Sequence, residues 1–584
     1  MKFILTGINS SYYQSAYAIY AIAAAYIGTE EMVVKEYHIN QPHGLILKDL
    51  FESNGDVYFF SCYLWNIEEI LHLSENLKQL KNCTIILGGS EVGYTPEQYF
   101  NRSDSIDYII SGEGEPVINQ LIIALSNGDN LSAIDCVYDK KKEYYSSSSS
   151  SEWLRYRKFP YSESDINSLN GKILYYESSR GCPYQCSYCI SQLDRRVRSL
   201  LMDVIENELL FFMNHQVKQV KFIDRTFNYD SERTVRILRF ILKHNVCTNF
   251  HFEICADLLT DELISIFNSA PVGFFQIEVG VQSTNPDTLD AINRKNDLNK
   301  ISSALTQIIG KKNVHVHADL IAMLPHETWE SFQSGFNYLY QIKPHMMQIG
   351  FLKILNGTKM YYLTDTYDIK HDTYPPYETF QTSTIPFPQY SELKNLSYLI
   401  DKFYNSGIVP NTLDYCIPKY ADTPFSFYEA FKNFLSKHHY LERPLSKKDC
   451  YIILSDYLQQ FDDCVIDSLI AYDYLLENPL HLPDGLNNRV VWISPKKLIP
   501  LLADNSFIQT YLPEFEGCRE KDIMKHICAV CFFSNPVNGT AQEKTIMLFT
   551  DQKENDVFSK NKSVILPFDC YHDLIDASSV RCFS

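Results

Sequence analysis

Three cysteines follow one another at the spacing C-x3-C-x2-C in the stretch Gly181-Cys182-Pro183-Tyr184-Gln185-Cys186-Ser187-Tyr188-Cys189. Thiolates are soft ligands that suit zinc or iron–sulfur clusters. A structural zinc site needs four ligands, and a cubane cluster held by four cysteines is likewise closed. Three close thiols without a near fourth therefore favour a cluster with one open iron, where chemistry can take place. Three buried cysteines that bind no metal are the weaker alternative, because a turn-forming glycine and proline share the stretch.

This stretch resembles the cluster motif of radical S-adenosylmethionine (radical SAM) enzymes, and the aromatic Tyr188 before the last cysteine is part of the resemblance. The resemblance implies a [4Fe-4S] cluster whose open iron binds the amino and carboxylate groups of SAM. Electron transfer then cleaves SAM to a 5′-deoxyadenosyl radical. The ligand role carries over to Cys182, Cys186 and Cys189, and Tyr188 becomes a candidate SAM contact.

The cysteines need a scaffold, and residues from about 170 to 355 repeat a strand followed by a helix. The expected strands are Ile173–Ser178, Val220–Ile223, Phe250–Ile254, Phe274–Val279, Val314–Ile321 and Met347–Leu352. Six parallel units indicate a barrel or partial barrel, whose active site lies at the carboxyl ends of the strands. The cysteines follow the first strand, which places them at that mouth. The family resemblance implies a partial (β/α)6 barrel, here over residues 169–358.

Acidic and polar residues lie along the later strands of this segment, mostly near their carboxyl ends. The resemblance assigns Asp224 to the SAM amino group, and Glu278 and Gln282 to the ribose. Taken singly, such acids are more often helix caps or buried ion pairs, but as a set on successive strands of one barrel they predict a SAM site. The candidate SAM contacts, besides Tyr188, are Asp224, Glu253, Glu278, Gln282 and Asp319. The family's usual glycine before Leu-Pro in the fifth-strand motif is replaced by Met323.

Residues 1–125 also alternate strands and helices, which indicates a doubly wound parallel sheet. The expected strands are Lys2–Gly7, Met32–His38, Val57–Tyr63, Thr84–Leu87 and Tyr108–Ser111. Ligands of such sheets bind beyond the carboxyl ends of the strands, and small and polar residues gather there. The candidate contacts at these ends are Asn9, Ser10, Ser61, Leu64, Gly88, Gly89 and Glu113.

Such a domain ahead of a radical SAM core resembles the cobalamin-binding subgroup of the family. More narrowly, the chain resembles members that end in a domain of unknown function. Ser-Cys-Tyr-Leu-Trp-Asn, Gly-Gly-Ser-Glu-Val and Gly-Glu-Gly-Glu carry this resemblance, which implies cobalamin as a further cofactor. The motif D-x-H-x-x-G is missing after the first strand. His38 and His43 follow the second strand instead and are interpreted as surface-loop histidines, so no histidine ligand to cobalt is expected.

The rest of the chain is less informative. Residues 126–168 are interpreted as a linker, with three lysines and the serine run 146–151. Residues 359–584 indicate an α+β domain, mainly helical to about residue 478. Cys528 and Cys531 have a metal-like spacing, but they lie in a strand-like run where residues three apart face opposite sides. That argues against a second metal site.

Composition limits the partners. The net charge of −19 disfavours nucleic acid, whose binding depends on lysine and arginine. No stretch reaches about 20 apolar residues, so no membrane span is expected. The scattered cysteines fit reduced thiols and a cytoplasmic location.

The sequence therefore predicts a radical SAM enzyme that uses a [4Fe-4S] cluster, SAM and cobalamin. The expected reaction is methylation or rearrangement at an unactivated carbon of a small molecule or peptide, with a reductant such as flavodoxin or ferredoxin. An RNA methylthiotransferase-like enzyme is one alternative, but it needs a second three-cysteine set, and only Cys62, Cys83 and Cys136 precede the barrel. A non-catalytic iron–sulfur or cobalamin-binding regulatory module is the other.

Overall fold

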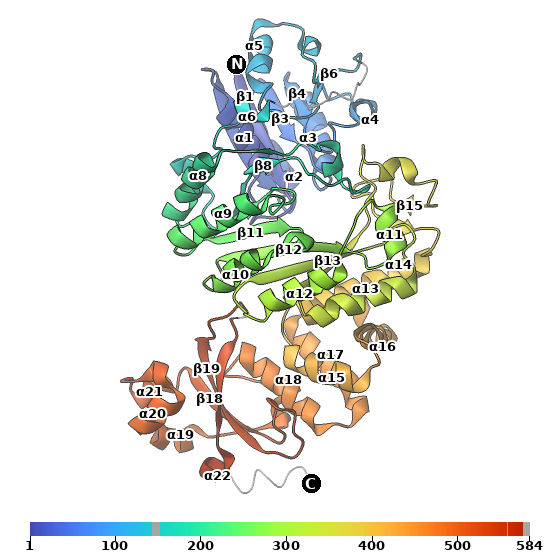
Figure 1. The fold of residues 1–584 in the computed structure, drawn as a ribbon. Coiled ribbons are helices and arrows are strands. Elements are labelled where there is room, and N and C mark those ends of the chain that lie inside the picture. The colour runs from blue at the N-terminus through green and yellow to red at the C-terminus, as the bar shows by residue number, and fades with distance from the viewer. Residues whose placement is uncertain (143–151, 558, 576–584) are drawn as a thin grey trace. The chain divides into compact units, whose positions relative to one another are not determined.

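A computed structural model describes residues 1–142, 152–557 and 559–575 (Figure 1). The serine run 146–151 of the expected linker lies outside these residues. Internal contacts divide the chain into two compact units, Met1–Phe332 with Gly350–Tyr390, and Gln333–Ile349 with Ser391–Ser584. Across the described ranges, no helix is both long and apolar enough to cross a membrane.

The first unit begins with a six-stranded sheet in the order β2-β1-β3-β4-β5-β6. Strands β1 to β5 are parallel and β6 is antiparallel to β5. The bounds are β1 Lys2–Asn9, β2 Glu31–His38, β3 Val57–Ser61, β4 Thr84–Gly88, β5 Tyr108–Ile110 and β6 Val137–Tyr138. Strands β1, β3 and β4 are almost continuously buried, because helices cover both faces of a parallel sheet. The predicted doubly wound sheet is confirmed.

Five helices follow the strands of this sheet. They are α1 Tyr17–Ala25, α2 His43–Glu52, α3 Ile67–Leu80, α4 Pro96–Arg102 and α5 Ile118–Asn127. The chain moves to one side of β1 for β2 and to the other side for β3, so right-handed crossovers place α1 on one face and α2 with α3 on the other. Helix α2 contacts α3, and α1 contacts α5. Ile70, Leu73 and Leu77 of α3 recur at helical spacing and join the core formed with β1 and β3.

The second sheet of the chain has six strands in the order β14-β13-β12-β11-β10-β7. The bounds are β7 Ile173–Tyr176, β10 Gln219–Phe222, β11 Asn249–Ile254, β12 Phe275–Gln282, β13 His315–Ala322 and β14 Met346–Phe351. The pairs from β7 to β13 are parallel. Because β7 and β14 are edge strands, the sheet is open, as the predicted partial barrel requires.

Helices connect these strands along the chain. They are α8 Met202–Asn214, α9 Ser231–His244, α10 Asp261–Ser269, α11 Pro286–Ala291, α12 Leu298–Ile309 and α13 Trp329–Ile342. Burial alternates along β12 and β13, with apolar residues fully buried and polar residues half-buried. Successive side chains of a strand point to opposite faces, so one face of the sheet is apolar and the other is polar. The polar face carries four of the six candidate SAM contacts, Glu253, Glu278, Gln282 and Asp319.

The second unit combines a helical part with a small antiparallel sheet. Its helices include α15 Pro410–Tyr420, α16 Pro424–Lys437, α17 Lys447–Leu458 and α18 Cys464–Glu477. Its sheet has the order β17-β18-β19-β20, with β17 Val490–Trp492, β18 Ile527–Phe532, β19 Thr545–Lys553 and β20 Asn561–Leu566. The α+β expectation for the C-terminal part is therefore confirmed.

Two details of this unit bear on the sequence predictions. The stretch predicted as mainly helical to about residue 478 is interrupted between α17 and α18, where the 3-10 turn Gln459–Phe461 ends at Asp462, which has a left-handed φ of 47°. Cys531 packs in the apolar core beside the sheet, whereas the Cys528 thiol bonds the carbonyl of Pro479. The two thiols thus have separate surroundings, as the alternation of side chains along a strand predicts.

Candidate active site

The three cysteines lie on a loop that is closed at its base. Strand β8 Ser179–Arg180 pairs antiparallel with β9 Arg198–Ser199, so residues 181–197 leave and return at one point. Gly181 has φ +98°, and a Cβ there would lie 2.4 Å from the Arg196 carbonyl oxygen, so only glycine fits. The Cys182 amide donates to the Asp194 carbonyl at 2.9 Å. We refer to residues 181–197 as the cysteine loop.

The cysteine loop presents its thiols in a partly enclosed setting. Cys182 and Cys186 are buried and Cys189 is half-buried. Among the described residues, one trio of metal-ligating side chains has all its ligand atoms within 4.8 Å of one another. That trio does not include these cysteines. The three sulfur atoms of the loop therefore do not all lie within 4.8 Å of one another, whereas a single tetrahedral zinc ion would hold its sulfur ligands about 3.8 Å apart.

Arg294, which the sequence reasoning missed, lies beside the cysteine loop. Its Nη1 is 3.8 Å from the Cys186 sulfur, and its Nε donates to Asn296 Oδ1 at 3.1 Å. Burial raises the pKa of the Cys186 thiol, and the Arg294 charge counters this by favouring the thiolate. The residue follows α11 in the sequence Ala-Ile-Asn-Arg-Lys. A pair of basic residues after a short helix carries no signal that separates a half-buried arginine from an exposed one.

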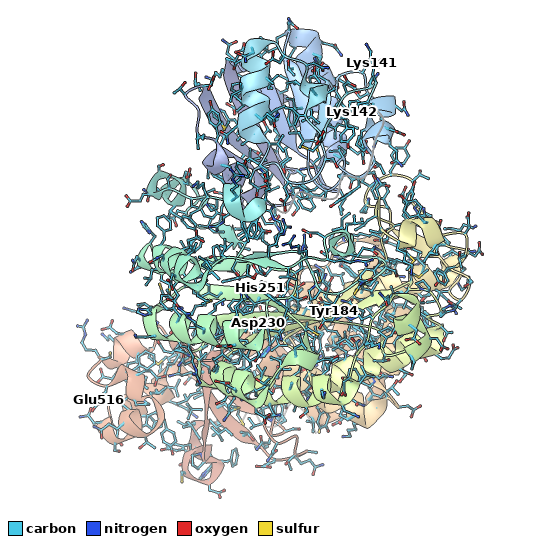
Figure 2. All side chains as sticks on the ribbon, turned by 45° about the horizontal axis from the view of Figure 1, so that its top comes forward. Lys141, Lys142, Tyr184, Asp230, His251 and Glu516 are labelled. Atoms are coloured by element: carbon cyan, nitrogen blue, oxygen red, sulfur yellow. The ribbon has the colours of Figure 1, made fainter. Side chains whose placement is uncertain are left out.

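A fourth thiol also lies next to this loop. The Tyr184 hydroxyl donates to the Cys255 sulfur at 3.5 Å, and Cys255 follows directly after β11. Figure 2 labels Tyr184 of the cysteine loop and His251 of β11. The carboxyl end of β11 therefore reaches the cysteine loop, as the parallel topology predicts for a barrel mouth.

Three of the predicted SAM contacts meet on adjacent strands. Glu253 and Glu278 are in register on β11 and β12, and Gly280 pairs with Asp319 on β13. Lys221 Nζ lies 3.0 Å from Glu278 and 3.4 Å from Glu253, and His251 lies 3.2 Å from Glu278. Burial opposes ionisation of Glu278, but His251 and Lys221 outweigh it and lower its pKa to about 2. Glu278 is therefore a carboxylate at neutral pH.

The pKa of Asp319 is shifted in the opposite direction. Burial, followed by the nearby charges of Glu278 and Glu253, raises the pKa of Asp319 to about 8. Its Oδ1 is buried and has no protein hydrogen-bond partner. The same holds for Oε1 of Gln282, a residue with φ +68° whose amide folds over Gly280. Buried polar atoms without partners need an explanation, and a polar ligand such as the ribose of SAM fits both.

Asp224 has a different environment from the predicted one. Its carboxylate is fully buried and accepts from the Ser178 amide at 2.8 Å, from the hydroxyls of Ser178 and Ser179 at 2.6 Å, and from Arg233 at 3.0 Å. Four donors occupy the acceptor sites of this carboxylate. The geometry therefore favours a role in positioning the segment before the cysteine loop, and the contact with the SAM amino group stays a prediction.

The base of the cysteine loop is tied to the first sheet. Arg180 Nη2 lies 2.7 Å from Glu115 and from Glu177, and Arg198 Nη1 lies 2.6 Å from Glu113. Arg180 also stacks on Trp153, with 4.8 Å between guanidinium and ring centre. Glu113 and Glu115 belong to the loop after β5, so we name Arg180, Arg198, Glu113 and Glu115 the arginine clamp. Glu113, a predicted cobalamin contact, pairs with protein cations through Oε1, and its role toward cobalamin stays a prediction.

The remaining candidate cobalamin contacts do lie at the carboxyl ends of β1, β3 and β4. Asn9 is already engaged, because its Nδ2 donates to the Gln14 carbonyl and to Glu36, both at 2.9 Å; Ser10 bonds Gln14. Gly89 has φ +110°, and the backbone of Cys62 occupies the place of a Cβ. Ser61, Leu64 and Gly88 carry no comparable constraint. Their roles toward cobalamin stay predictions.

An aromatic platform follows β3 within the stretch Ser-Cys-Tyr-Leu-Trp-Asn, although its two rings were not among the predicted cobalamin contacts. The rings of Tyr63 and Trp65 stack at 4.5 Å with 6° between their planes, and Trp65 is 41 % exposed. Asn66 holds this loop by donating to the carbonyls of Ile8 and Ser61, both at 2.9 Å. An exposed flat aromatic surface at the ligand-binding edge of the sheet fits a large planar cofactor.

Three segments of the chain each match the model of a known protein family. Residues 8–122 match the model of the B12 binding domain, residues 176–339 the radical SAM superfamily, and residues 365–549 a protein of unknown function, DUF4080. The chain therefore contains these three domains in this order, which confirms the predicted resemblance to the cobalamin-binding subgroup of radical SAM proteins. The two cofactor-binding domains support the predicted set of a [4Fe-4S] cluster, SAM and cobalamin.

Curated relatives and solved structures agree with this assignment. The cobalamin-dependent radical SAM methyltransferase TokK of Streptomyces tokunonensis is 23 % identical over 59 % of this chain and 54 % of its own. The 2-(S-pantetheinyl)-carbapenam-3-carboxylate methyltransferase of Streptantibioticus cattleyicolor is 24 % identical over 50 % and 46 %. The chain thus spans about half the length of these relatives.

Among structures, the cobalamin-dependent SAM radical enzyme OxsB matches with a TM-score of 0.56 and 16 % identity over 83 % of both chains. TsrM of Kitasatospora setae matches with 0.53 and 14 % over 64 % of this chain and 79 % of its own. Identities this low concern the fold.

Proposed function

We propose that this chain is a cobalamin-dependent radical SAM methyltransferase that acts on an unactivated carbon of a small molecule or peptide. The observation that carries the proposal is the closed cysteine loop at the mouth of the second sheet, tied by the arginine clamp to the loop after β5. Two cofactor sites whose loops are joined by buried ion pairs suit a reaction that uses both cofactors. The similarity to two curated methyltransferases supports methylation over rearrangement.

Each part of the site has a role under this proposal. When bound, the cofactors supply a 5′-deoxyadenosyl radical and a methyl group. Cys182, Cys186 and Cys189 hold the cluster, and Arg294 places a positive charge beside Cys186. Gln282 and the protonated Asp319 supply polar atoms for SAM, and Glu278 supplies a carboxylate. The aromatic platform and the ends of β3 and β4 receive cobalamin.

The RNA methylthiotransferase alternative has less support. Two tRNA methylthiotransferases are also similar, at 27 % identity over 32 % of this chain and 22 % over 52 %. A second cluster in the first sheet would need three converging thiols. Cys62 and Cys83 are both packed in the hydrophobic core, and burial raises the pKa of each thiol. Thiols held neutral in a core are poor metal ligands.

The products of SAM distinguish these functions. Anaerobically reconstituted protein should be incubated with SAM, cobalamin, a reductant and a panel of small-molecule and peptide acceptors. Mass spectrometry should detect 5′-deoxyadenosine together with S-adenosylhomocysteine if the protein transfers methyl groups. Deoxyadenosine alone would mean radical chemistry without methylation. Uncleaved SAM in the presence of an intact, reduced cluster would support a regulatory module and contradict the proposal.

A further inference from the structure

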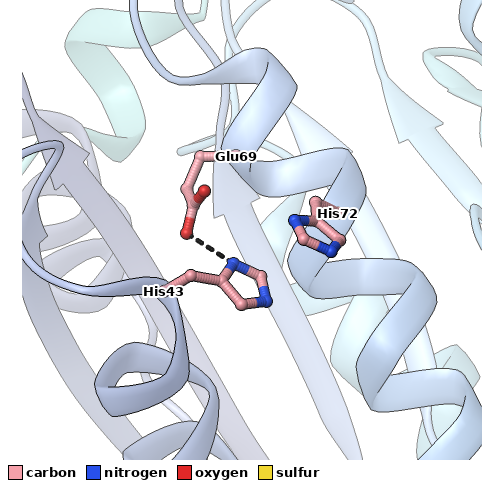
Figure 3. A group of neighbouring side chains, drawn as sticks. All are labelled: His43, Glu69 and His72. Atoms are coloured by element: carbon pink, nitrogen blue, oxygen red, sulfur yellow. Dashed lines mark hydrogen bonds and ion pairs between the residues drawn. The ribbon is translucent and has the colours of Figure 1, made fainter.

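A histidine–glutamate cluster lies on two helices of the first sheet and shares no residue with the candidate active site. His43 is the first residue of α2, and Glu69 and His72 lie three residues apart on α3. Residues at that spacing share one helix face. One ligand atom of each of the three residues lies within 4.8 Å of those of the other two. Figure 3 shows the three side chains gathered between the two helices.

The hydrogen bonds of His43 describe the cluster without a metal. Its Nδ1 lies 2.8 Å from Glu69 Oε1, and its Nε2 lies 2.9 Å from Asn76 Nδ2. The rings of His43 and His72 stack at 4.0 Å with 17° between their planes. The side chains of His43 and Glu69 are 25 % and 28 % exposed, and His72 is exposed. The cluster is therefore both organised and open to ions from solvent.

We propose that His43, Glu69 and His72 form a divalent-metal site of the zinc type. Two imidazoles and one carboxylate are a typical three-ligand set for zinc, with the fourth position left to water. The Glu-x-x-His pair on one helix also recurs as a ligand pair in helical metal proteins. Zinc bonds of about 2.0–2.2 Å place neighbouring ligand atoms about 3.3–3.6 Å apart. The 2.8 Å between His43 and Glu69 opens by about half an ångström when the ion replaces the shared proton.

Two side-chain adjustments complete the site. His72 turns its ring out of the stack so that a nitrogen points to the ion, and its exposed position permits this. With Nδ1 of His43 on the metal, Nε2 carries a proton and needs an acceptor. A flip of the Asn76 amide supplies Oδ1, which is the outer partner that a metal-bound histidine usually has. Asn76 is thus a positioning residue for this site.

The site would join two neighbouring elements. Helices α2 and α3 pack together over one face of the first sheet, and no side chain caps the start of α2, where His43 stands. An ion held by both helices would fix that start. The site shares no residue with the cysteine loop or the arginine clamp, so it stands or falls independently of the proposed function.

Zinc binding to the holoenzyme tests this inference. Protein with a reconstituted cluster should be titrated with zinc against a chromophoric chelator. We expect the parent to bind one zinc per chain. The zinc affinities of H43A, E69Q and H72A should each be at least about 10-fold lower. That of N76A should be about 10-fold lower, because an outer hydrogen-bond partner is lost. H244A, which removes an exposed histidine of α9, should bind zinc as the parent does.

X-ray absorption at the zinc edge identifies the ligands. Nitrogen and oxygen at about 2.0–2.2 Å, without sulfur at about 2.3 Å, would support the site. Sulfur ligands would mean that zinc binds the cysteines instead, and this would overturn the inference. Equal zinc affinity in H43A, E69Q, H72A and the parent would overturn it as well.

Discussion

Arg180 and Glu115 lie 2.7 Å apart, which joins the residue directly before the cysteine loop to the loop after the last parallel strand of the first sheet. The guanidinium also contacts Glu177 and Trp153. Side-chain exposure is 20 % for Arg180 and 6 % for Glu115, so water screens this pair only weakly. The contact therefore links the position of the cysteines to the domain that binds cobalamin.

Loss of Arg180 should destabilise the protein and loosen the cysteine loop. Breaking a buried pair by removing one partner costs about 3–5 kcal/mol, because carboxylates remain buried and unpaired. R180A should lower the melting temperature and the iron content after reconstitution, and R180K should recover part of both. R236A is the matched control, since its arginine pairs with Asp203 and Glu206 at the surface and costs at most about 1 kcal/mol. Equal stability of R180A and R236A would contradict the clamp.

The raised pKa of Asp319 predicts a pH-dependent stability. The folded protein holds this proton up to about pH 8, whereas the unfolded chain releases it near pH 4. The folded state therefore binds more protons between these values, and stability falls as pH rises through this window. Between pH 6 and 8 the free energy of unfolding of D319N should therefore fall by about 2 kcal/mol less than that of the parent. Melting curves of parent and D319N in this range test the difference, and parallel curves would disprove it.

The variant D224N distinguishes a structural role of Asp224 from a role in SAM binding. The four hydrogen bonds to its carboxylate predict that D224N loses about 3 kcal/mol or more of the free energy of unfolding. The folded fraction should still bind SAM with nearly the parent affinity. D203N is the control, because the side chain of Asp203 is 90 % exposed. A stable D224N protein with greatly weakened SAM binding would restore the predicted contact with the SAM amino group.

Arg294 should influence the cluster through its charge. A positive group near Cys186 stabilises the reduced, more negative cluster, so R294Q should shift the reduction potential by roughly 50 mV to more negative values. R294K keeps the charge and should shift it less. K295Q removes an exposed neighbouring charge and should leave the potential unchanged. The potentials of the three variants, measured by redox titration of the cluster's electron paramagnetic resonance signal, give the comparison. No shift in R294Q would contradict the role.

Local patterns predicted the scaffold well. Each expected strand of the two parallel sheets overlaps an observed one, because buried strands read as short apolar runs between turn residues. The strand predicted over Val57–Tyr63, for example, is observed at Val57–Ser61. The spacing of Cys182, Cys186 and Cys189 is local too, so the cysteine loop could be recognised from the sequence alone.

Long-range side-chain pairing could not be predicted in this way. Glu113 follows a strand and lies between glycines, and no local pattern shows that it pairs with Arg180 and Arg198, which lie far along the chain. Asp224 also ends a strand, yet Ser178, Ser179 and Arg233 occupy its carboxylate. His43 reads as a lone loop histidine until α2 and α3 pack together. Such pairings depend on the tertiary fold, which local sequence patterns do not contain.

The central claim is that three thiols hold a cluster that cleaves SAM. C182A, C186A and C189A should each be reconstituted anaerobically beside the parent and the control C247A, which alters an exposed cysteine. Release of 5′-deoxyadenosine under a strong reductant, measured per chain together with the iron content, is the decisive measurement. The account predicts product from the parent and C247A and only background from the three variants. Cleavage at the parental rate by any one of the three would contradict it.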